Sequence, residues 1–350
     1  MNKFFILLIS LFPLALPDMA QDTSGRPSFK PITIADQGSF AVGGTVLRDS
    51  AGHQYHGDHA YVFYQKPVKA RKYPLVFAHG VGQFSKAWET TPDGREGFQT
   101  LFLRKGYATY VVDQPRRGNA GRGTETVTIT PKFDEEVWFN RFRLGIYPDF
   151  FEGVQFSRDK EALNQYFRQM TPTLGSADLN VYAEAYAALF DKIGPSIFVT
   201  HSQGGGVGWL TVPQTRNIRA IIAFEPGCDV PFPKGQVPEE GMVLTLSGRT
   251  EGVEVVMSDF LKFTKIPIII YFGDNLPETN ERPELYEWTR RLHLMQKWAA
   301  LINSHGGDAT VIHLPDVGLH GNTHFPFSDL NNVQVAEHVA KWLHDKRLDM

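Results

Sequence analysis

The stretch SIFVTHSQGGG, residues 196–206, carries the local pattern that decides the fold. It begins with a short run of mainly apolar and β-branched residues, as in a buried strand, and glycines follow directly after Ser202 and Gln203. A serine at a sharp turn from a strand into a helix is a nucleophile elbow, where crowding requires small residues two positions before and after the serine. Gly204 meets the second requirement, whereas Thr200 stands where the usual pattern has glycine. Because the glycine run lacks the Lys-Ser/Thr ending of a phosphate-binding loop, the stretch predicts a strand that leads into a nucleophilic Ser202.

Short apolar runs alternate with helical stretches on both sides of this turn. The strands expected from these runs are 61–64, 74–78, 108–113, 196–200, 220–224, 267–272 and 310–314. The expected helices are 95–105, 181–189, 286–304 and 333–346. This alternation is typical of an α/β fold in which helices cover both faces of a mostly parallel sheet. Residues 40–46, ahead of the turn near Gly52, predict an antiparallel hairpin that precedes the sheet.

The composition excludes several classes of protein. The 350 residues include 35 Lys+Arg against 38 Asp+Glu, so no basic face for a nucleic acid is expected. The 26 Phe, 12 Tyr and 6 Trp are too many for a disordered chain. Cys228 is the single cysteine, which rules out an internal disulfide and a cysteine-rich metal cluster.

Residues 1–20 have the pattern of a secretory signal peptide. Lys3 supplies a positive charge, residues 4–16 supply an apolar stretch, and Ala20 is a small residue at a plausible cleavage point. The apolar stretch is shorter than the roughly 20 residues that span a bilayer, so stable membrane insertion is not expected. The pattern predicts that the mature chain, residues 21–350, is exported to the periplasm or the extracellular space, with an uncleaved anchor as the alternative.

Two stretches interrupt the alternation of strands and helices. Residues 116–180 separate the strand at 108–113 from the helix at 181–189, and ten of the forty residues 131–170 are aromatic. Residues 231–265 are irregular and contain Gly, Pro and charged residues. The aromatic content predicts that the first stretch is buried against the core. We therefore expect both stretches to be cap insertions on one α/β domain rather than independent domains.

A serine nucleophile needs a histidine base and an acid that orients the histidine. In chains with this pattern, the order is serine, acid, histidine. For the base, His320 follows the last predicted strand, and His324, a little further along the same loop, is the second choice. For the acid, Asp274 follows the strand at 267–272 and Glu225 ends the strand after the nucleophile helix. The residues alone leave both acids open.

The tetrahedral intermediate of such a reaction needs two N–H donors. Gln203, directly after the nucleophile, offers one backbone N–H. The second is expected from the His-Gly-Val-Gly loop after the strand at 74–78, at the backbone N–H of Val81. This chemistry requires no cofactor and no metal.

Two other groups of polar residues have competing interpretations. His53, His56 and His59 have spacings that place them on opposite faces of a hairpin, so a solvated hairpin is favoured over a metal site. Arg116 and Arg117 shape the mouth of a pocket or, alternatively, hold an acidic group of the substrate.

Several further stretches resemble one family of enzymes. They are WETTPDGREGF (88–98), FLRKGY (102–107), VWFNRFRLGIYPDFF (137–151), HSQ (201–203), EPG (225–227), GLHGNTH (318–324) and NNVQVA (331–336). Over residues 38–343 the chain therefore resembles the α/β-hydrolase superfamily. Within it, the chain resembles the secreted bacterial esterases typified by the Alcaligenes esterase, whose triad acid follows the sixth strand.

This resemblance implies a triad of Ser202, Glu225 and His320. It also makes Asp274 a structural residue that orders the loop under His320. In the esterases that it resembles, adjacent cysteines follow the His-Gly pair, whereas Val81 and a glycine stand here. The oxyanion loop must therefore be held in place differently.

The sequence as a whole predicts a serine carboxylesterase that cleaves carboxylic esters through an acyl-enzyme. Its partner is expected to be a small-molecule ester with an apolar or aromatic part, because of the aromatic first insertion. The alternatives are a serine hydrolase or acyltransferase that acts on amides, lactones or polyesters, and a catalytically silent secreted binding protein on the same fold.

Overall fold

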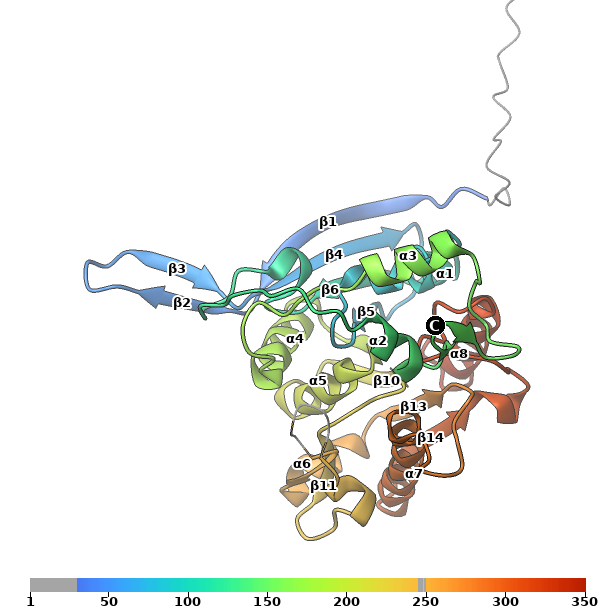
Figure 1. Cartoon of the computed structure of the whole chain (residues 1–350). Helices are drawn as coiled ribbons and strands as arrows, with labels where there is room; N and C mark the ends of the chain where they lie inside the picture. Colours follow the sequence, from blue (N-terminus) through green and yellow to red (C-terminus); the bar gives the residue numbers. More distant parts are fainter. Residues whose placement is uncertain (1–29, 245–247, 249) are drawn as a thin grey trace, which may run out of the picture. The chain divides into compact units, whose positions relative to one another are not determined.

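An eight-stranded sheet forms the centre of the computed structural model (Figure 1). In spatial order its strands are β1 (Ile34–Val42), β4 (Ala60–Pro67), β6 (Thr109–Asp113), β5 (Leu75–Ala78), β9 (Ser196–His201), β10 (Ile218–Phe224), β13 (Pro267–Phe272) and β14 (Asp308–His313). β1 and β4 pair in antiparallel fashion, β4 is antiparallel to β6, and the strands from β6 to β14 are mutually parallel. All seven strands expected from the sequence are confirmed.

The structure describes residues 30–244, 248 and 250–350. The signal peptide expected at residues 1–20 lies outside the described residues. The elements of the fold belong to one compact unit, Thr33–Met350. Within the described ranges, no helix is both long enough and apolar enough to cross a membrane.

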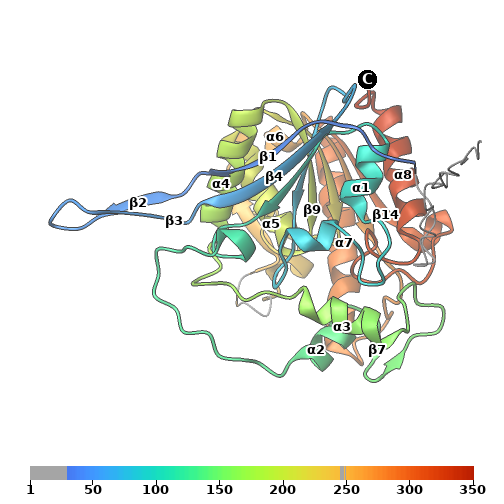
Figure 2. The same ribbon diagram turned by 90° about the horizontal axis from the view of Figure 1, so that it is seen from above.

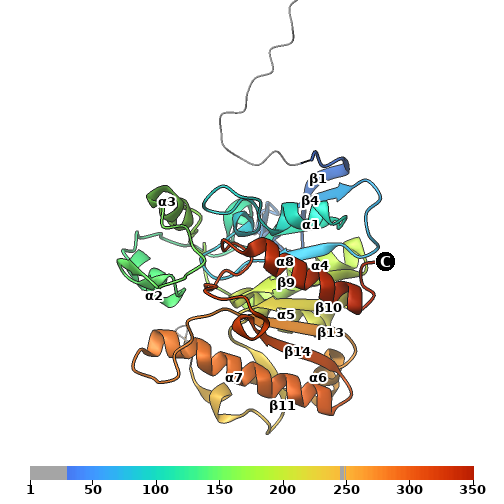
Figure 3. The ribbon, with the colours of Figure 1, turned by 90° about the vertical axis from the view of Figure 1, so that its right-hand side faces the viewer.

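Helices cover both faces of the sheet, as the sequence predicts (Figure 3). One buried cluster includes side chains from α4 (Leu179–Ile193), α5 (Gln203–Thr211), α6 (Met257–Phe263) and α7 (Pro283–Ser304). The cluster on the other face includes side chains from α1 (Phe98–Arg104) and α8 (Asn332–Asp345). The parallel strands supply apolar side chains to both clusters, which explains why their sequences are almost continuously apolar.

The predicted hairpin exists, but it begins later than expected (Figure 2). It consists of β2 (Thr45–Arg48) and β3 (Gln54–Gly57), which pair in antiparallel fashion. The first residues of the expected 40–46 segment instead continue β1, which pairs with β4. Gly43 and Gly44, with φ angles of 68° and 91°, separate the two strands, because this backbone conformation interrupts extended pairing.

The two insertions carry short elements that the sequence did not predict. The first contains α2 (Glu135–Arg141), the strand pair β7 (Gly145–Ile146) and β8 (Asp149–Phe150), and α3 (Lys160–Arg168). The second contains the strand pair β11 (Val230–Pro233) and β12 (Gly252–Val255), followed by α6. Aromatic side chains of the first insertion join the cluster that contains α1 and α8, so this insertion shares the core of the sheet.

Candidate active site

Ser202 lies at the sharp turn between β9 and α5. Its backbone is in a left-handed conformation, with φ 53° and ψ −122°, that non-glycine residues adopt at a cost. A Cβ atom on Gly204 would lie 2.8 Å from the carbonyl oxygen of His79, so only glycine fits at that position. Thr200 is accommodated because the facing residue is Gly208, whose added Cβ would lie 3.1 Å from the Thr200 methyl group. The turn therefore has the tight geometry of a nucleophile elbow.

Glu225 and His324 form a fully buried pair. The Nδ1 atom of His324 lies 2.7 Å from the Oε2 atom of Glu225, and both side chains are shielded from solvent. The imidazole ring stacks on Phe142 at a centroid distance of 4.9 Å and contacts the Trp288 ring at 4.1 Å. His201, directly before Ser202, donates from Nε2 to the backbone carbonyl of His324 over 3.0 Å. These contacts hold the imidazole in one orientation next to the nucleophile turn.

The structure does not place His320, the expected base, beside Glu225. The side chain of His320 is 71% exposed, and its Nδ1 atom lies 3.8 Å from Asp274 Oδ2. Gly321 then turns the chain inward with φ 76°, where an added Cβ would lie 2.0 Å from a backbone oxygen of Gly153. The second choice from the sequence, His324, therefore takes the buried position next to the acid.

Asp274, the other candidate acid, orders this loop. Its Oδ2 atom accepts the backbone N–H of Gly321 over 2.7 Å, and its own N–H donates to the carbonyl of Asn322 over 2.8 Å. This agrees with the structural role that the resemblance implies. Beyond the turn, the buried carboxylate of Asp329 accepts the N–H and the hydroxyl of Thr323, both over 2.7 Å. Hydrogen bonds to Asp274 and Asp329 thus fix the segment that carries His324.

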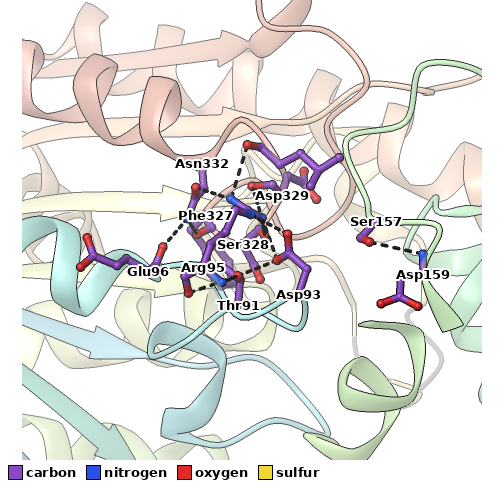
Figure 4. Close-up of polar contacts among 11 residues, drawn as sticks. Thr91, Asp93, Arg95, Glu96, Ser157, Asp159, Phe327, Ser328, Asp329 and Asn332 are labelled. Carbon is purple, nitrogen blue, oxygen red and sulfur yellow. Dashed lines mark hydrogen bonds and ion pairs between the residues drawn. The ribbon is translucent and has the colours of Figure 1, made fainter. Parts of the chain in front are cut away.

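Arg95, from the Trp88–Phe98 stretch, anchors the same loop further along the chain (Figure 4). Its Nη2 atom donates to the carbonyls of Ser328 and Asp329 over 3.2 and 3.1 Å. Its Nη1 atom donates to Asn332 Oδ1 over 2.7 Å, and Asp93 holds its Nε atom over 2.6 Å. The stretch that resembles the esterases therefore supports the loop that carries His324.

A cavity of about 150 Å³ opens beside Ser202. It is also lined by Val81, Trp138, Arg141, Phe142, Gln203, Gly227, Cys228, Trp288 and Arg291. A second cavity of about 550 Å³ shares Val81, Trp138 and Phe142 with the first and extends along residues 127–132 and 170–173. The two residues expected to supply oxyanion donors therefore line the same cavity as the serine.

The buried charges in the wall of this cavity are paired. Arg141 contacts Glu287, and Arg291 contacts both Glu287, over 2.5 Å, and Glu251, over 2.8 Å. Burial raises the pKa of the Cys228 thiol well above its usual value, so this thiol is uncharged. The wall thus combines aromatic side chains with balanced charges.

The model of the family described as "Alpha/beta hydrolase family" matches residues 75–337. The chain belongs to this family. The hydrolase is similar to a solved structure described as a novel bacterial esterase, with 30% sequence identity and a TM-score of 0.72, over 91% of this chain and 98% of the esterase. It is also 27% identical over 298 residues to the probable secreted lipase phiG of Fungal sp. (strain ATCC 74256), which covers 77% of this chain and 81% of the lipase.

The acid of the buried pair in this hydrolase is held ionised by a second buried group. The Nη2 atom of Arg143 contacts Glu225 Oε1, which also accepts the backbone N–H of Gly273 over 2.6 Å. Burial acts to raise the pKa of Glu225, but the Arg143 charge and the His324 hydrogen bond outweigh it and lower the pKa to about 2. An ionised carboxylate only accepts hydrogen bonds, so the Nδ1 atom of His324 carries the proton and Nε2 has the free lone pair.

Burial lowers the pKa of His324 to about 4, although the hydrogen bond and charge of Glu225 act in the opposite direction. The imidazole is therefore neutral at neutral pH. Its Nε2 atom is buried and has no hydrogen-bond partner among the residues that the structure describes. A neutral, oriented imidazole with a free Nε2 has the properties of a general base.

Arg143, Trp288 and Arg291 of this site were not identified from the sequence, and His201 was noted only as part of the HSQ motif. Arg143 lies in the aromatic stretch at 137–151, but this stretch also contains Arg141 and Asp149, so charge alone did not single Arg143 out. Arg116, in contrast, is not available for a substrate, since it pairs with Asp58 over 2.7 Å and with Glu125 over 2.7 Å.

Proposed function

We propose that this hydrolase is a serine carboxylesterase whose triad consists of Ser202, His324 and Glu225. The observation that carries the proposal is the buried pair of His324 and Glu225, which adjoins the strained turn of Ser202. A buried carboxylate or imidazole without a partner would reduce the stability of the fold. A nucleophile, a base and an acid that orients the base together form a catalytic triad.

In the proposed mechanism, the hydroxyl oxygen of Ser202 attacks the ester carbonyl while the Nε2 atom of His324 takes the hydroxyl proton. Glu225 stabilises the imidazolium that forms and keeps Nδ1 protonated. The backbone N–H groups of Val81 and Gln203 stabilise the negative charge on the former carbonyl oxygen. His324 then returns the proton to the leaving alcohol. Water, activated by the same imidazole, cleaves the acyl-enzyme.

The proposed substrate is an uncharged ester with an apolar or aromatic part. The cavity beside Ser202 has aromatic walls from Trp138, Phe142 and Trp288, and the arginines in its wall are already paired. The esterase and the lipase to which the chain is similar bear names of ester-cleaving enzymes. We also propose that residues 1–20 direct export, in line with the secreted lipase's name.

The experiment that tests this function is hydrolysis of p-nitrophenyl acetate, butyrate, benzoate and palmitate by the purified protein. We expect the short and aromatic esters to be cleaved with higher kcat/KM than palmitate, because the cavity that Ser202 lines measures only about 150 Å³ and has aromatic walls, whereas Ser202 does not line the adjoining cavity of about 550 Å³. Ser202→Ala should lose this activity for every ester. Turnover of amides or lactones in place of all these esters would contradict the proposed substrate class, and equal rates for Ser202→Ala would contradict the mechanism.

The activity should persist at unusually low pH. Proton abstraction requires neutral His324, so kcat/KM should fall as the pH drops through the pKa of this group, about 4. If the base had the ordinary histidine pKa of about 6.5, the enzyme would lose half of its kcat/KM already at about pH 6.5. The measurement is kcat/KM for an uncharged ester from about pH 3.5 to 8, with circular dichroism at each pH as the control for folding, because acid can unfold the chain at the low end. An acid limb near pH 6.5 would contradict the described environment of His324.

A further inference from the structure

The carbonyl oxygen of Gly80 accepts two buried hydrogen bonds. The Nδ1 atom of His79 lies 2.9 Å from it, and the Nη1 atom of Arg117 lies 3.1 Å from it. The same peptide group carries the N–H of Val81, and in a planar trans peptide the C=O and the N–H point in opposite directions. The two donors to the Gly80 oxygen therefore also determine where the Val81 N–H points.

This peptide lies directly against the nucleophile. A Cβ atom on Gly80 would lie 2.9 Å from the Cβ of Ser202 and 3.0 Å from the Nδ1 atom of His201. Val81 and Ser202 also line the same cavity. A small rotation of the Gly80–Val81 peptide would consequently change the position of a donor at the reacting centre.

The tautomer of His79 is determined by its surroundings. The backbone N–H of Gln114 donates to the Nε2 atom of His79 over 3.2 Å, so Nε2 is the acceptor and Nδ1 carries the proton that Gly80 accepts. Burial, followed by the charge of Arg117, lowers the pKa of His79 to about 4. His79 is therefore a neutral donor, and Arg117 is the cationic one.

Arg117 is fully buried, and in the described part of the chain its side-chain hydrogen bonds go to Thr173, Gly80 and Gln114 and to no carboxylate. Its Nε atom donates to the Thr173 hydroxyl over 2.9 Å, and Nη1 also donates to the side-chain oxygen of Gln114 over 3.1 Å. Its guanidinium carbon lies 5.5 Å from the centroid of the Tyr182 ring. Nη2 is buried without a hydrogen-bond partner in the described ranges. A buried cation without an anionic partner costs stability, so packing alone does not account for it.

We propose that Arg117 is a positioning residue for the oxyanion hole. Together with His79 it holds the Gly80–Val81 peptide so that the Val81 N–H points toward the oxygen that becomes negative. Its charge also polarises this peptide and strengthens the N–H as a donor. Arg117 touches no reacting atom and acts only through the peptide. The inference rests on the proposed function, because it presumes attack by Ser202.

The test compares Arg117→Met and Arg117→Lys with Arg116→Lys, a matched change of the neighbouring buried arginine. Two ketone inhibitors are used that differ only in a trifluoromethyl group in place of a methyl group. A trifluoromethyl ketone forms a tetrahedral adduct with the serine and carries an oxyanion, whereas the corresponding methyl ketone stays planar. Inhibition constants for both ketones, and kcat and KM for p-nitrophenyl acetate, are measured for each variant.

We expect Arg117→Met to lower kcat by roughly 10- to 10²-fold with little change in KM, which is less than the 10²- to 10³-fold loss on removing an oxyanion donor outright, because the Val81 N–H remains and His79 still holds the peptide. Its affinity for the trifluoromethyl ketone should fall by a similar factor, while its affinity for the methyl ketone stays close to that of the wild type. Arg117→Lys, which keeps a cationic donor, should recover part of both losses. Arg116→Lys should behave like the wild type.

The inference is overturned if Arg117→Met binds the trifluoromethyl ketone as the wild type does, or if both ketones lose affinity equally. If neither Arg117 variant folds, Thr173→Val is measured instead. Thr173 is only partly buried, and its hydroxyl accepts a hydrogen bond from the Nε atom of Arg117. Thr173→Val should show a smaller, selective loss for the trifluoromethyl ketone, and no loss would overturn the inference. A wild type that neither cleaves esters nor binds this ketone would refute the proposed function, and this inference with it.

Discussion

His324→Ala should lower kcat/KM for p-nitrophenyl acetate by up to about a million-fold, the scale on which removal of a triad base acts. His320→Ala, on the same loop, should leave kcat/KM close to the wild-type value. The physical reason is that His324 is buried against Glu225 over 2.7 Å, whereas the side chain of His320 is 71% exposed. The measurement is steady-state hydrolysis by the wild type and both variants, with thermal unfolding as the control for folding.

The comparison of these two histidines is decisive because they are only four residues apart. Loss of activity in His320→Ala with retention in His324→Ala would identify His320 as the base, as the sequence analysis expects. Equal retention in both would show that neither imidazole acts as the base.

Glu225→Gln should lower kcat by about 10⁴-fold, because an amide in place of the carboxylate no longer holds His324 in the required tautomer. Asp274→Asn should retain most of the activity, since Asp274 contacts the loop backbone at Gly321 rather than the buried imidazole. Both variants are isosteric with the wild-type residues, so the comparison isolates charge. Steady-state kinetics with p-nitrophenyl acetate measure the difference.

The Glu225 variant also requires a control for stability. Glu225→Gln leaves the charge of Arg143 without its anionic partner, and breaking a buried ion pair in this way typically costs about 3–5 kcal/mol. The free energy of unfolding should therefore be measured by urea denaturation beside the kinetics. A Glu225→Gln variant that folds and keeps wild-type kcat, together with an inactive Asp274→Asn, would identify Asp274 as the acid.

The fold was predictable because its central strands are buried on both faces. Such strands appear as apolar runs in the sequence, for example at 196–200 and 267–272, and the positions of α1, α4, α7 and α8 were predicted with boundaries that differ from the observed ones by up to four residues. The short elements of the insertions, such as α2 and β7, were not predictable. The aromatic residues of the first insertion pack on the core, and their spacing in the sequence does not follow a helical or strand period. The sequence pattern therefore does not predict these elements.

The candidate site was predictable in part. Ser202 and Glu225 stand at strand ends with motifs that mark them, and both lie in the site. The choice between His320 and His324 depended on the path of one loop. The aromatic residues Phe325 and Phe327 after His324 are buried, and their apolar character was the signal that this end of the loop turns inward.

The buried arginines could not be assigned from the sequence. Arg143 and Arg117 lie in segments far from the residues that they contact, Glu225 and Gly80, and only the folded chain brings them together. The absence of the adjacent cysteines after the His-Gly pair predicted that the oxyanion loop is held differently, but not by which group.

The most direct test of the central claim is reaction of the purified protein with diethyl p-nitrophenyl phosphate. A serine hydrolase forms a stable covalent phosphoryl adduct on its nucleophile, so release of one p-nitrophenolate per chain and a single modified peptide are the readouts. We predict that the modification maps to Ser202, and that His324→Ala reacts far more slowly while His320→Ala reacts like the wild type. A protein that stays unmodified, or that is modified at another residue such as Cys228, would contradict the account.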